Sequence, residues 1–224
     1  MVFMRKGAIV YTHSYRKPST LYVNLTPRYA CVNKCVFCDK NALERYVGAK
    51  LLLSKAPTAK DVLKELQKKA SSKTREIVFC GIGEPTLYLN TLLKVTRGVK
   101  NYFPSVRVRV NTNGQAELIN KNRGDVARAL KNAGVDEVSV SLNALTPGQY
   151  QRFCRSRFGR KAFWAVLKFV RHCKRAGIKT SVSFVEGYPG LKINKKAATA
   201  LARSLGVRKE NVLFRQFVSG SGRV

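Results

Sequence analysis

Acidic residues are scarce in this chain of 224 residues: 12 Asp and Glu stand against 43 Lys and Arg, a formal net charge of +31. An excess of this size repels itself in the compact state and attracts polyanions. The ion-pair networks of thermophilic proteins need both signs, so they do not account for the composition. Residues 138–185 include ten basic residues and no acid. We therefore expect RNA, DNA or another polyanion as a partner.

Long apolar runs are also missing. No stretch of 18 uncharged apolar residues occurs, which excludes a membrane-spanning helix. Near the start, Arg5 and Lys6 precede only the short apolar run 8–11, which is too brief for the core of a secretory signal. These absences predict a soluble, cytoplasmic protein.

Linker-like segments rich in Pro, Gly and Ser are absent, as are internal repeats and low-complexity stretches. Hydrophobic residues make up 45% of the chain, enough for one core. The expectation is a single domain over residues 1–224. Within it, residues 1–20 form an N-terminal extension and residues 219–224 a flexible tail.

Six cysteines are present, and their distribution is uneven. Cys31, Cys35 and Cys38 lie within eight residues, whereas Cys80, Cys154 and Cys173 stand alone and are expected to be structural. Three thiolates so close together can bind one metal centre. A structural zinc site normally has four ligands, and no second cysteine pair or Cys/His knuckle occurs. A [4Fe–4S] cluster bound by three thiolates would leave one iron open. A zinc site remains the alternative.

Strand and helix patterns alternate regularly. The strands are expected at 21–25, 76–80, 106–110, 135–142, 178–185 and 212–218. The helices are expected at 58–70, 89–101, 122–133, 147–153, 161–176 and 195–205. This βα alternation predicts an α/β fold with a parallel sheet. Six units are too few for a closed eight-unit barrel, so we expect an open, partial (β/α)6 TIM-like barrel.

Polar or glycine-rich segments follow the first four expected strands. The cysteine cluster comes first, followed by Gly81-Ile82-Gly83-Glu84-Pro85, Asn111-Thr112-Asn113-Gly114 and Ser141-Leu142-Asn143. The carboxyl ends of parallel strands meet at one rim, which is where such folds bind ligands. The sequence therefore predicts one site at that rim.

Cys-x3-Cys-x2-Cys, with Phe37 just before the last cysteine, resembles the signature of the radical S-adenosylmethionine (radical SAM) superfamily. The Gly-x-Gly-Glu-Pro segment after the second strand agrees with it. Segments 21–26, 78–86, 111–114 and 138–144 together look like the TatD-associated radical SAM proteins. The resemblance covers nearly the whole chain. It departs on the fifth strand, where Ser-Val-Ser-Phe-Val at 181–185 replaces the Gly-x-Ile-x-Gly-x-x-Glu adenine motif.

The resemblance implies an enzyme in which a [4Fe–4S] cluster, reduced by an external electron donor, cleaves S-adenosylmethionine. The resulting 5′-deoxyadenosyl radical would abstract a hydrogen atom from a substrate. Three thiolates would hold the cluster: Cys31, Cys35 and Cys38. The cofactor contacts implied are Phe37 beside the adenine, then Gly81, Gly83, Glu84 and Pro85 around the methionine amino group, and Asn113, Ser141 and Asn143 toward the ribose or carboxylate.

The segment after the fourth strand is basic, and its polyanion contacts are expected at Arg152, Arg155, Arg157, Arg160 and Lys161. Aromatic residues are interleaved with them: Phe153, Phe158, Phe163 and Trp164. Such a mixture can engage single-stranded RNA by phosphate contact and stacking. Aromatics at helical spacing are also typical of a core.

Two other functions stay open at this point. One is a non-catalytic nucleic-acid-binding protein with a structural zinc site, which predicts bound zinc and salt-dependent binding. The other is a partner-dependent radical activase that acts on another protein. It would bind RNA weakly and need a cognate chain.

Overall fold

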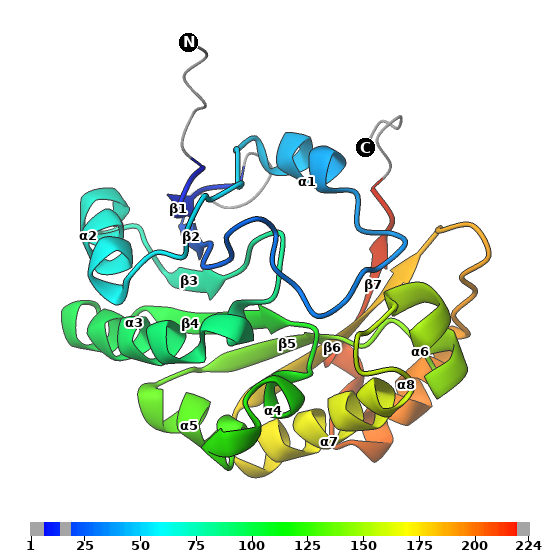
Figure 1. Ribbon diagram of the computed structural model, residues 1–224. Coiled ribbons are helices and arrows are strands. Elements are labelled where there is room, and N and C mark those ends of the chain that lie inside the picture. The colour runs from blue at the N-terminus through cyan, green and yellow to red at the C-terminus, as the bar shows by residue number, and fades with distance from the viewer. Residues whose placement is uncertain (1–6, 14–18, 219–224) are drawn as a thin grey trace.

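The computed structural model describes residues 7–13 and 19–218 and contains a seven-stranded sheet in the order β1-β2-β3-β4-β5-β6-β7 (Figure 1). Six strands run parallel, each beside its sequence neighbour. They are β2 (Thr20–Val23), β3 (Glu76–Phe79), β4 (Arg107–Thr112), β5 (Glu137–Ser141), β6 (Lys179–Glu186) and β7 (Val212–Gln216). The two-residue β1 (Val10–Tyr11) pairs antiparallel with β2. The six parallel strands confirm the predicted partial barrel.

Helices connect the parallel strands and cover the outer face of the sheet (Figure 1). The α-helices are α1 (Lys40–Val47), α2 (Ala59–Lys69), α3 (Leu89–Tyr102), α4 (Ala116–Ile119), α5 (Val126–Ala133), α6 (Pro147–Cys154), α7 (Lys161–Arg175) and α8 (Lys195–Ser204). Short 3-10 turns lie at η1 (Pro85–Tyr88), η2 (Lys121–Arg123) and η3 (Lys209–Asn211). Within the described ranges, no helix combines the length and apolar character that a bilayer crossing requires.

The two faces of the sheet differ in chemistry because side chains alternate along each strand. On β5, Val138 and Val140 are fully buried in the core formed with the helices. The residues between and after them, Ser139 and Ser141, point to the inner, concave face. The same alternation on β6 places Ser181 and Ser183 beside these two serines in the parallel register. The central part of the inner face is therefore lined by hydroxyl groups.

Helices α1, α4 and α5 differ from the sequence expectations, which did not include α4. The helix expected at 122–133 begins only at Val126, because Gly124 is left-handed at φ 65° and Asp125 caps the helix by accepting from Arg128 N. Helix α1 was not expected. Asp39 caps its start and Gly48 ends it at φ 70°.

The N-terminal extension expected at 1–20 contains β1, which is part of the sheet. The tail expected at 219–224 lies outside the described residues.

Candidate functional site

The loop that carries the three cysteines follows β2 and has no regular secondary structure over most of its length. Its backbone is hydrogen-bonded to the connection between α6 and α7. The amides of Lys34 and Val36 donate to the carbonyls of Cys154 and Phe153 at 3.1 and 2.9 Å. A segment more than 110 residues away in sequence thus holds the loop in position.

Four buried polar side chains, one of which is Asn33 of the loop itself, form a hydrogen-bond network that holds the same loop. Gln115, which follows β4, donates through Nε2 to Asn33 Oδ1 at 2.7 Å and to the Tyr150 hydroxyl at 3.0 Å. Its Oε1 accepts from Ser156 Oγ at 2.6 Å. Asn33 Nδ2 also donates to the Tyr150 hydroxyl, at 3.1 Å. None of the four is more than 9% exposed, so water does not compete for these bonds. We call this set the amide network.

All three clustered cysteines are free thiols; Cys31 and Cys38 are exposed and Cys35 is partly buried. Their sulfur atoms are not all within 4.8 Å of one another. A tetrahedral zinc with Zn–S bonds of about 2.3 Å would need S···S separations of about 3.8 Å. The spread does not suit a single zinc ion. A [4Fe–4S] cluster, in which each thiolate binds a different iron, does not require the three sulfur atoms to meet at one ion.

Local surroundings disfavour the thiolate form of each cysteine in the metal-free chain. Desolvation, reinforced by the Glu84 carboxylate, raises the pKa of Cys31 to about 12. A hydrogen bond with the Cys154 thiol, together with burial, raises the pKa of Cys35 well above its usual value. Desolvation also raises the pKa of Cys38. Positive charge from a bound metal centre would favour the thiolates.

Glu84 joins the loops after β3 and β4. Its side chain is 1% exposed, and burial raises the pKa of its carboxyl group. One oxygen accepts from Thr86 N, Thr86 Oγ1 and Thr112 Oγ1 at 2.7–3.0 Å, and the other accepts from Asn113 N at 2.6 Å. The family resemblance implies that this carboxylate accepts from a cofactor amino group. In the structure its hydrogen bonds are made within the chain.

Asn113 is the residue of the β4 loop that reaches the cysteines. Its Nδ2 donates to Cys31 Sγ at 3.7 Å, and its Oδ1 accepts from Gln115 N at 2.9 Å. Gly83 lies on the neighbouring β3 loop at φ +153°. A Cβ there would stand 2.5 Å from Thr26 Oγ1 and 2.7 Å from Ala30 O, so the backbone fits only glycine. Pro85, next to Glu84, is buried.

The ends of β5 and β6 meet at Asn143, which is left-handed at φ 56°. Its Oδ1 accepts from Val185 N at 3.0 Å and so ties the two strand ends together. Ser141 is half-buried on the inner face. Phe37 packs edge-on against Tyr188, with ring centroids 6.0 Å apart. Tyr188 follows β6 and was not predicted.

Among the residues that the structure describes, a buried hydroxyl of the inner face, below this rim, has no hydrogen-bond partner. Ser181 is 3% exposed, and its Oγ makes no hydrogen bond with the described part of the chain. Such an atom is costly unless something polar satisfies it. A polar ligand bound over the hydroxyl-lined inner face, as S-adenosylmethionine would be, fits this observation.

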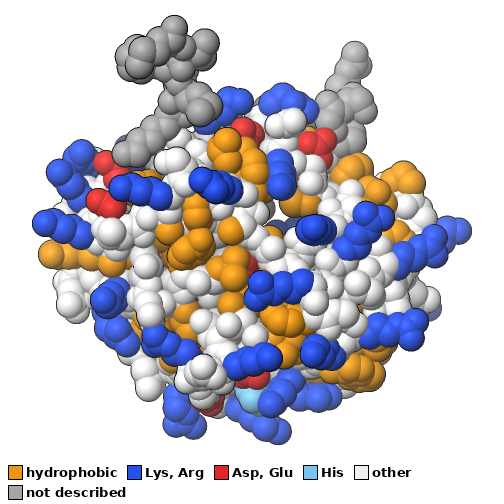
Figure 2. Space-filling view, viewed as in Figure 1, with side chains coloured by type: hydrophobic (Ala, Val, Ile, Leu, Met, Phe, Trp, Pro, Cys, Tyr) orange, Lys and Arg blue, Asp and Glu red, His pale blue; other side chains and the backbone are white. Residues whose placement is uncertain are grey.

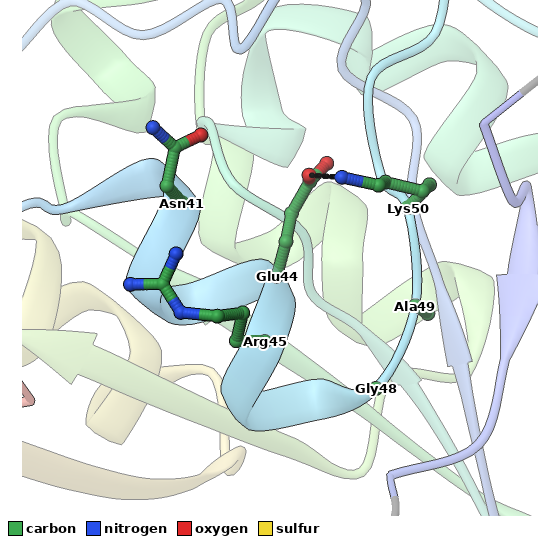
Figure 3. A pocket seen from close by; sticks show the side chains of 6 residues that line it. All are labelled: Asn41, Glu44, Arg45, Gly48, Ala49 and Lys50. Carbon is green, nitrogen blue, oxygen red and sulfur yellow. Dashed lines mark ion pairs between the residues drawn. The ribbon is translucent and has the colours of Figure 1, made fainter. Parts of the chain in front are cut away.

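A hollow of about 440 Å³ lies beside α1, and Figure 3 shows the side chains that line it. Lys50 forms an ion pair across it with Glu44 at 3.6 Å, and Glu44 also accepts hydrogen bonds from Tyr29 and Leu51. The hollow is lined by Asn41, Glu44, Arg45, Gly48, Ala49 and Lys50. None of the predicted site residues lines it.

The predicted basic segment is exposed at Arg152, Arg155, Arg157, Arg160 and Lys161. The interleaved aromatics are not a single group. Phe163 is buried in the core, Phe153 is buried against Tyr188, and Phe158 is half-buried beside the core. Trp164 is 61% exposed. The core reading therefore holds for the two buried aromatics, and Trp164 alone of the four is exposed for stacking.

Comparison with known proteins agrees with this geometry. Residues 25–201 match the family model of the radical SAM superfamily. The chain is 26% identical over 185 residues to the dual-specificity RNA methyltransferase RlmN of Buchnera aphidicola. The aligned segment covers 77% of this chain and 47% of RlmN. It is 30% identical over 138 residues to a probable GTP 3′,8-cyclase of Methanococcus maripaludis, covering 61% and 40%. The chain spans less than half the length of these curated relatives.

Solved structures share the fold. Streptococcus suis SuiB bound to S-adenosylmethionine superposes with a TM-score of 0.58 at 16% identity, covering 91% of this chain and 39% of SuiB. A radical SAM methyltransferase from Sphaerobacter thermophilus gives a TM-score of 0.61 at 18% identity, covering 90% and 57%. Members of the superfamily are enzymes that bind a [4Fe–4S] cluster and S-adenosylmethionine. With its family match over most of its length, its partial barrel and its cysteine loop at the rim, this chain belongs to the radical SAM superfamily.

Proposed function

We propose that this chain binds a [4Fe–4S] cluster through Cys31, Cys35 and Cys38 and uses it to cleave S-adenosylmethionine reductively. The observation that supports the proposal best is the placement of the cysteine loop. It lies at the rim where the loops after β3 and β4 meet, and Asn113 contacts Cys31 there. When bound, the reduced cluster supplies the electron that breaks the C5′–S bond and yields methionine and a 5′-deoxyadenosyl radical.

The chain's own residues orient the cofactors and keep the loop in place. Phe37, held against Tyr188, would pack beside the adenine. Gly81, Gly83, Glu84 and Pro85 would line the methionine amino group, and Glu84 also holds that loop in place. Asn113, Ser141 and Asn143 would face the ribose or carboxylate, and the Ser181 hydroxyl, which has no partner among the described residues, is a further polar group on the inner face.

Within the superfamily, we propose the TatD-associated group as the nearest type, because segments 21–26, 78–86, 111–114 and 138–144 carry its pattern. The domain covers residues 1–224 in this proposal. The substrate is a polyanion, with RNA first among the candidates, because of the formal charge of +31. A reducing, cytoplasmic location and an external electron donor suit a chain with six free cysteines.

The test is anaerobic reconstitution with iron and sulfide, followed by dithionite, S-adenosylmethionine and a chromatographic assay for 5′-deoxyadenosine. The wild type should contain iron and form the product. Cys31→Ala, Cys35→Ala and Cys38→Ala should each lose both. Cys80→Ala, which removes a thiol outside the cluster loop, is the matched control and should keep both.

Two results would contradict the proposal. One is a protein that takes up zinc and never iron. The other is an iron-loaded protein that forms no 5′-deoxyadenosine with or without added RNA.

A further inference from the structure

The solvent-facing side of α7 carries a continuous basic stripe with one aromatic inside it. Lys161, Trp164, Lys168, Arg171 and Arg175 are all exposed. Their spacing of three, four, three and four residues places them within an arc of about 80° on the helix. The stripe is about 21 Å long at the usual rise per residue. The opposite side of α7 is apolar and buried in the core.

Trp164 is the only tryptophan of the chain and, at 61%, the most exposed large apolar side chain among the described residues. It lies one turn after Lys161 and one turn before Lys168. Its exposed ring packs edge-on against Phe163, with centroids 5.3 Å apart, so the core partly fixes its orientation. An exposed, oriented indole between cations is a platform on which a planar group can stack.

The charge of the stripe is not neutralised within the molecule. Each of the twelve Asp and Glu side chains is engaged in a hydrogen bond or ion pair elsewhere, and none lies between residues 138 and 185. Lys161, Lys168, Arg171 and Arg175 form no ion pair within the described residues. Figure 2 likewise shows many Lys and Arg and few Asp and Glu on the face that it displays.

Helix stability does not account for these cations. Basic residues in the last turn of a helix, such as Arg175, favour its dipole, but basic residues at its start oppose it. Arg160 is the N-cap of α7 and Lys161 its first residue, and the first turn contains no acid. The cations at this end therefore have no stabilising role in the helix.

The connection that precedes α7, at the Lys161 end of the stripe, is hydrogen-bonded to the cysteine loop. Arg155 and Arg157 lie in the connection that precedes α7. There Lys34 N donates to Arg155 O at 3.2 Å, and Arg157 N donates to Val32 O at 3.0 Å. A chain bound along α7 and continued past Arg157 would reach the rim that holds the cysteines.

We propose that the α7 stripe, together with Arg155 and Arg157, binds a single-stranded nucleic acid and leads it to the radical site. Cations at one-turn spacing match a phosphate backbone, and Trp164 offers a stacking surface to one unpaired base. A membrane surface does not suit this helix, because an interfacial helix needs an apolar face, and that of α7 is in the core. The claim that the bound strand is the substrate rests on the function proposed above. The claim that the stripe binds a strand does not.

The test is the binding of a labelled 12-nucleotide single-stranded RNA of mixed sequence to the reconstituted protein, without S-adenosylmethionine or reductant. Anisotropy gives the affinity, and quenching of the one tryptophan reports contact at Trp164. Trp164→Ala should weaken binding about 5- to 100-fold, since one stacked base contributes that much. It should leave the binding of duplex RNA unchanged, because paired bases are not available for stacking.

A pair of charge variants separates the effect of the stripe on binding from the effect of the overall charge. Lys168→Glu/Arg171→Glu changes the stripe, whereas Lys60→Glu/Lys64→Glu changes two exposed lysines of α2. Reversing two cations removes four charges from +31, so both variants have a formal charge of +27. The stripe variant should bind at least about tenfold more weakly and lower the slope of log K against log salt by about 1.4. The α2 variant should bind within about threefold of wild type.

Equal losses in the two charge variants, or an unchanged affinity in Trp164→Ala, would overturn the proposal. Single-stranded DNA of the same sequence distinguishes the two sources of such a strand. RNA is the partner if it binds more tightly than the DNA, which lacks the 2′-hydroxyl, and DNA is the partner if the order is reversed. Binding without any 5′-deoxyadenosine in the separate assay would refute the radical function and leave the binding surface intact.

Discussion

Replacing Gln115 with leucine should loosen the cysteine loop, because it removes the centre of the amide network. Gln115 is fully buried, and its side chain makes three hydrogen bonds. Without it, Asn33 Oδ1 and the Ser156 hydroxyl hydrogen lose their partners. The Tyr150 hydroxyl keeps the hydrogen bond from Asn33 Nδ2. Two buried groups left unpaired cost about 1–3 kcal/mol each, so the expected loss of stability is about 2–6 kcal/mol.

Thermal and urea unfolding of the reconstituted protein would measure this loss. For a domain of this size, a loss of about 4 kcal/mol corresponds to a fall in Tm of about 8–16 °C. Gln67→Leu is the matched control, since Gln67 is exposed on α2 and the change should stay within about 0.5 kcal/mol. Hydrogen exchange at the Lys34 and Val36 amides should quicken only in Gln115→Leu. Equal stabilities of the two variants, or unchanged exchange at both amides, would refute the reasoning.

Three further predictions concern the rim and the acid limit of stability. Gly83→Ala should lower the free energy of unfolding, measured in urea, by several kcal/mol, because a Cβ would meet other atoms at 2.5–2.7 Å. The control Gly148→Ala, where the nearest atom is 3.8 Å away, should lower it by less than about 1 kcal/mol. Glu84→Gln should lower the free energy of unfolding by about 1–3 kcal/mol, because an NH2 group replaces an oxygen that accepts a hydrogen bond. The same change at the exposed Glu210 should alter it by no more than about 0.5 kcal/mol. Equal effects of the two changes would contradict this account.

The third prediction concerns the pKa of Glu44. Burial raises the pKa of its carboxyl group, but the hydrogen bonds that the carboxylate accepts outweigh burial and hold the pKa below its usual 4.5. The contribution of Glu44 to the free energy of unfolding is therefore full above pH 4.5 and is lost as the pH falls through the lowered pKa. Glu44→Gln should flatten the acid limb of a stability–pH curve. An unchanged limb would count against this reasoning.

The parallel strands and the rim were predictable because they depend on local patterns. Alternation such as Val138-Ser139-Val140-Ser141 indicates both a strand and its two faces, and polar segments at successive strand ends must meet. The amide network was not predictable, because Asn33 and Gln115 are 82 residues apart and no local pattern joins them.

The role of Glu84 was also beyond the sequence, because a motif indicates which residue is present but not which partner its carboxylate finds. The basic stripe could have been found. The spacing from Lys161 through Trp164 to Arg175 was in the sequence, and only the direction of the core had to be read from Phe163 and Val166.

The complete engagement of the carboxylates bears on how this sequence can change during evolution. Losing any one of the twelve breaks a hydrogen bond or ion pair and adds one more positive charge to an already repulsive surface. Losing one of the exposed, unpaired cations breaks no ion pair and relieves repulsion. Random change should therefore lower the net charge over time. If relatives of this chain keep so high a charge, the cations themselves are under selection, and the acids should be the steadiest charged positions outside the site.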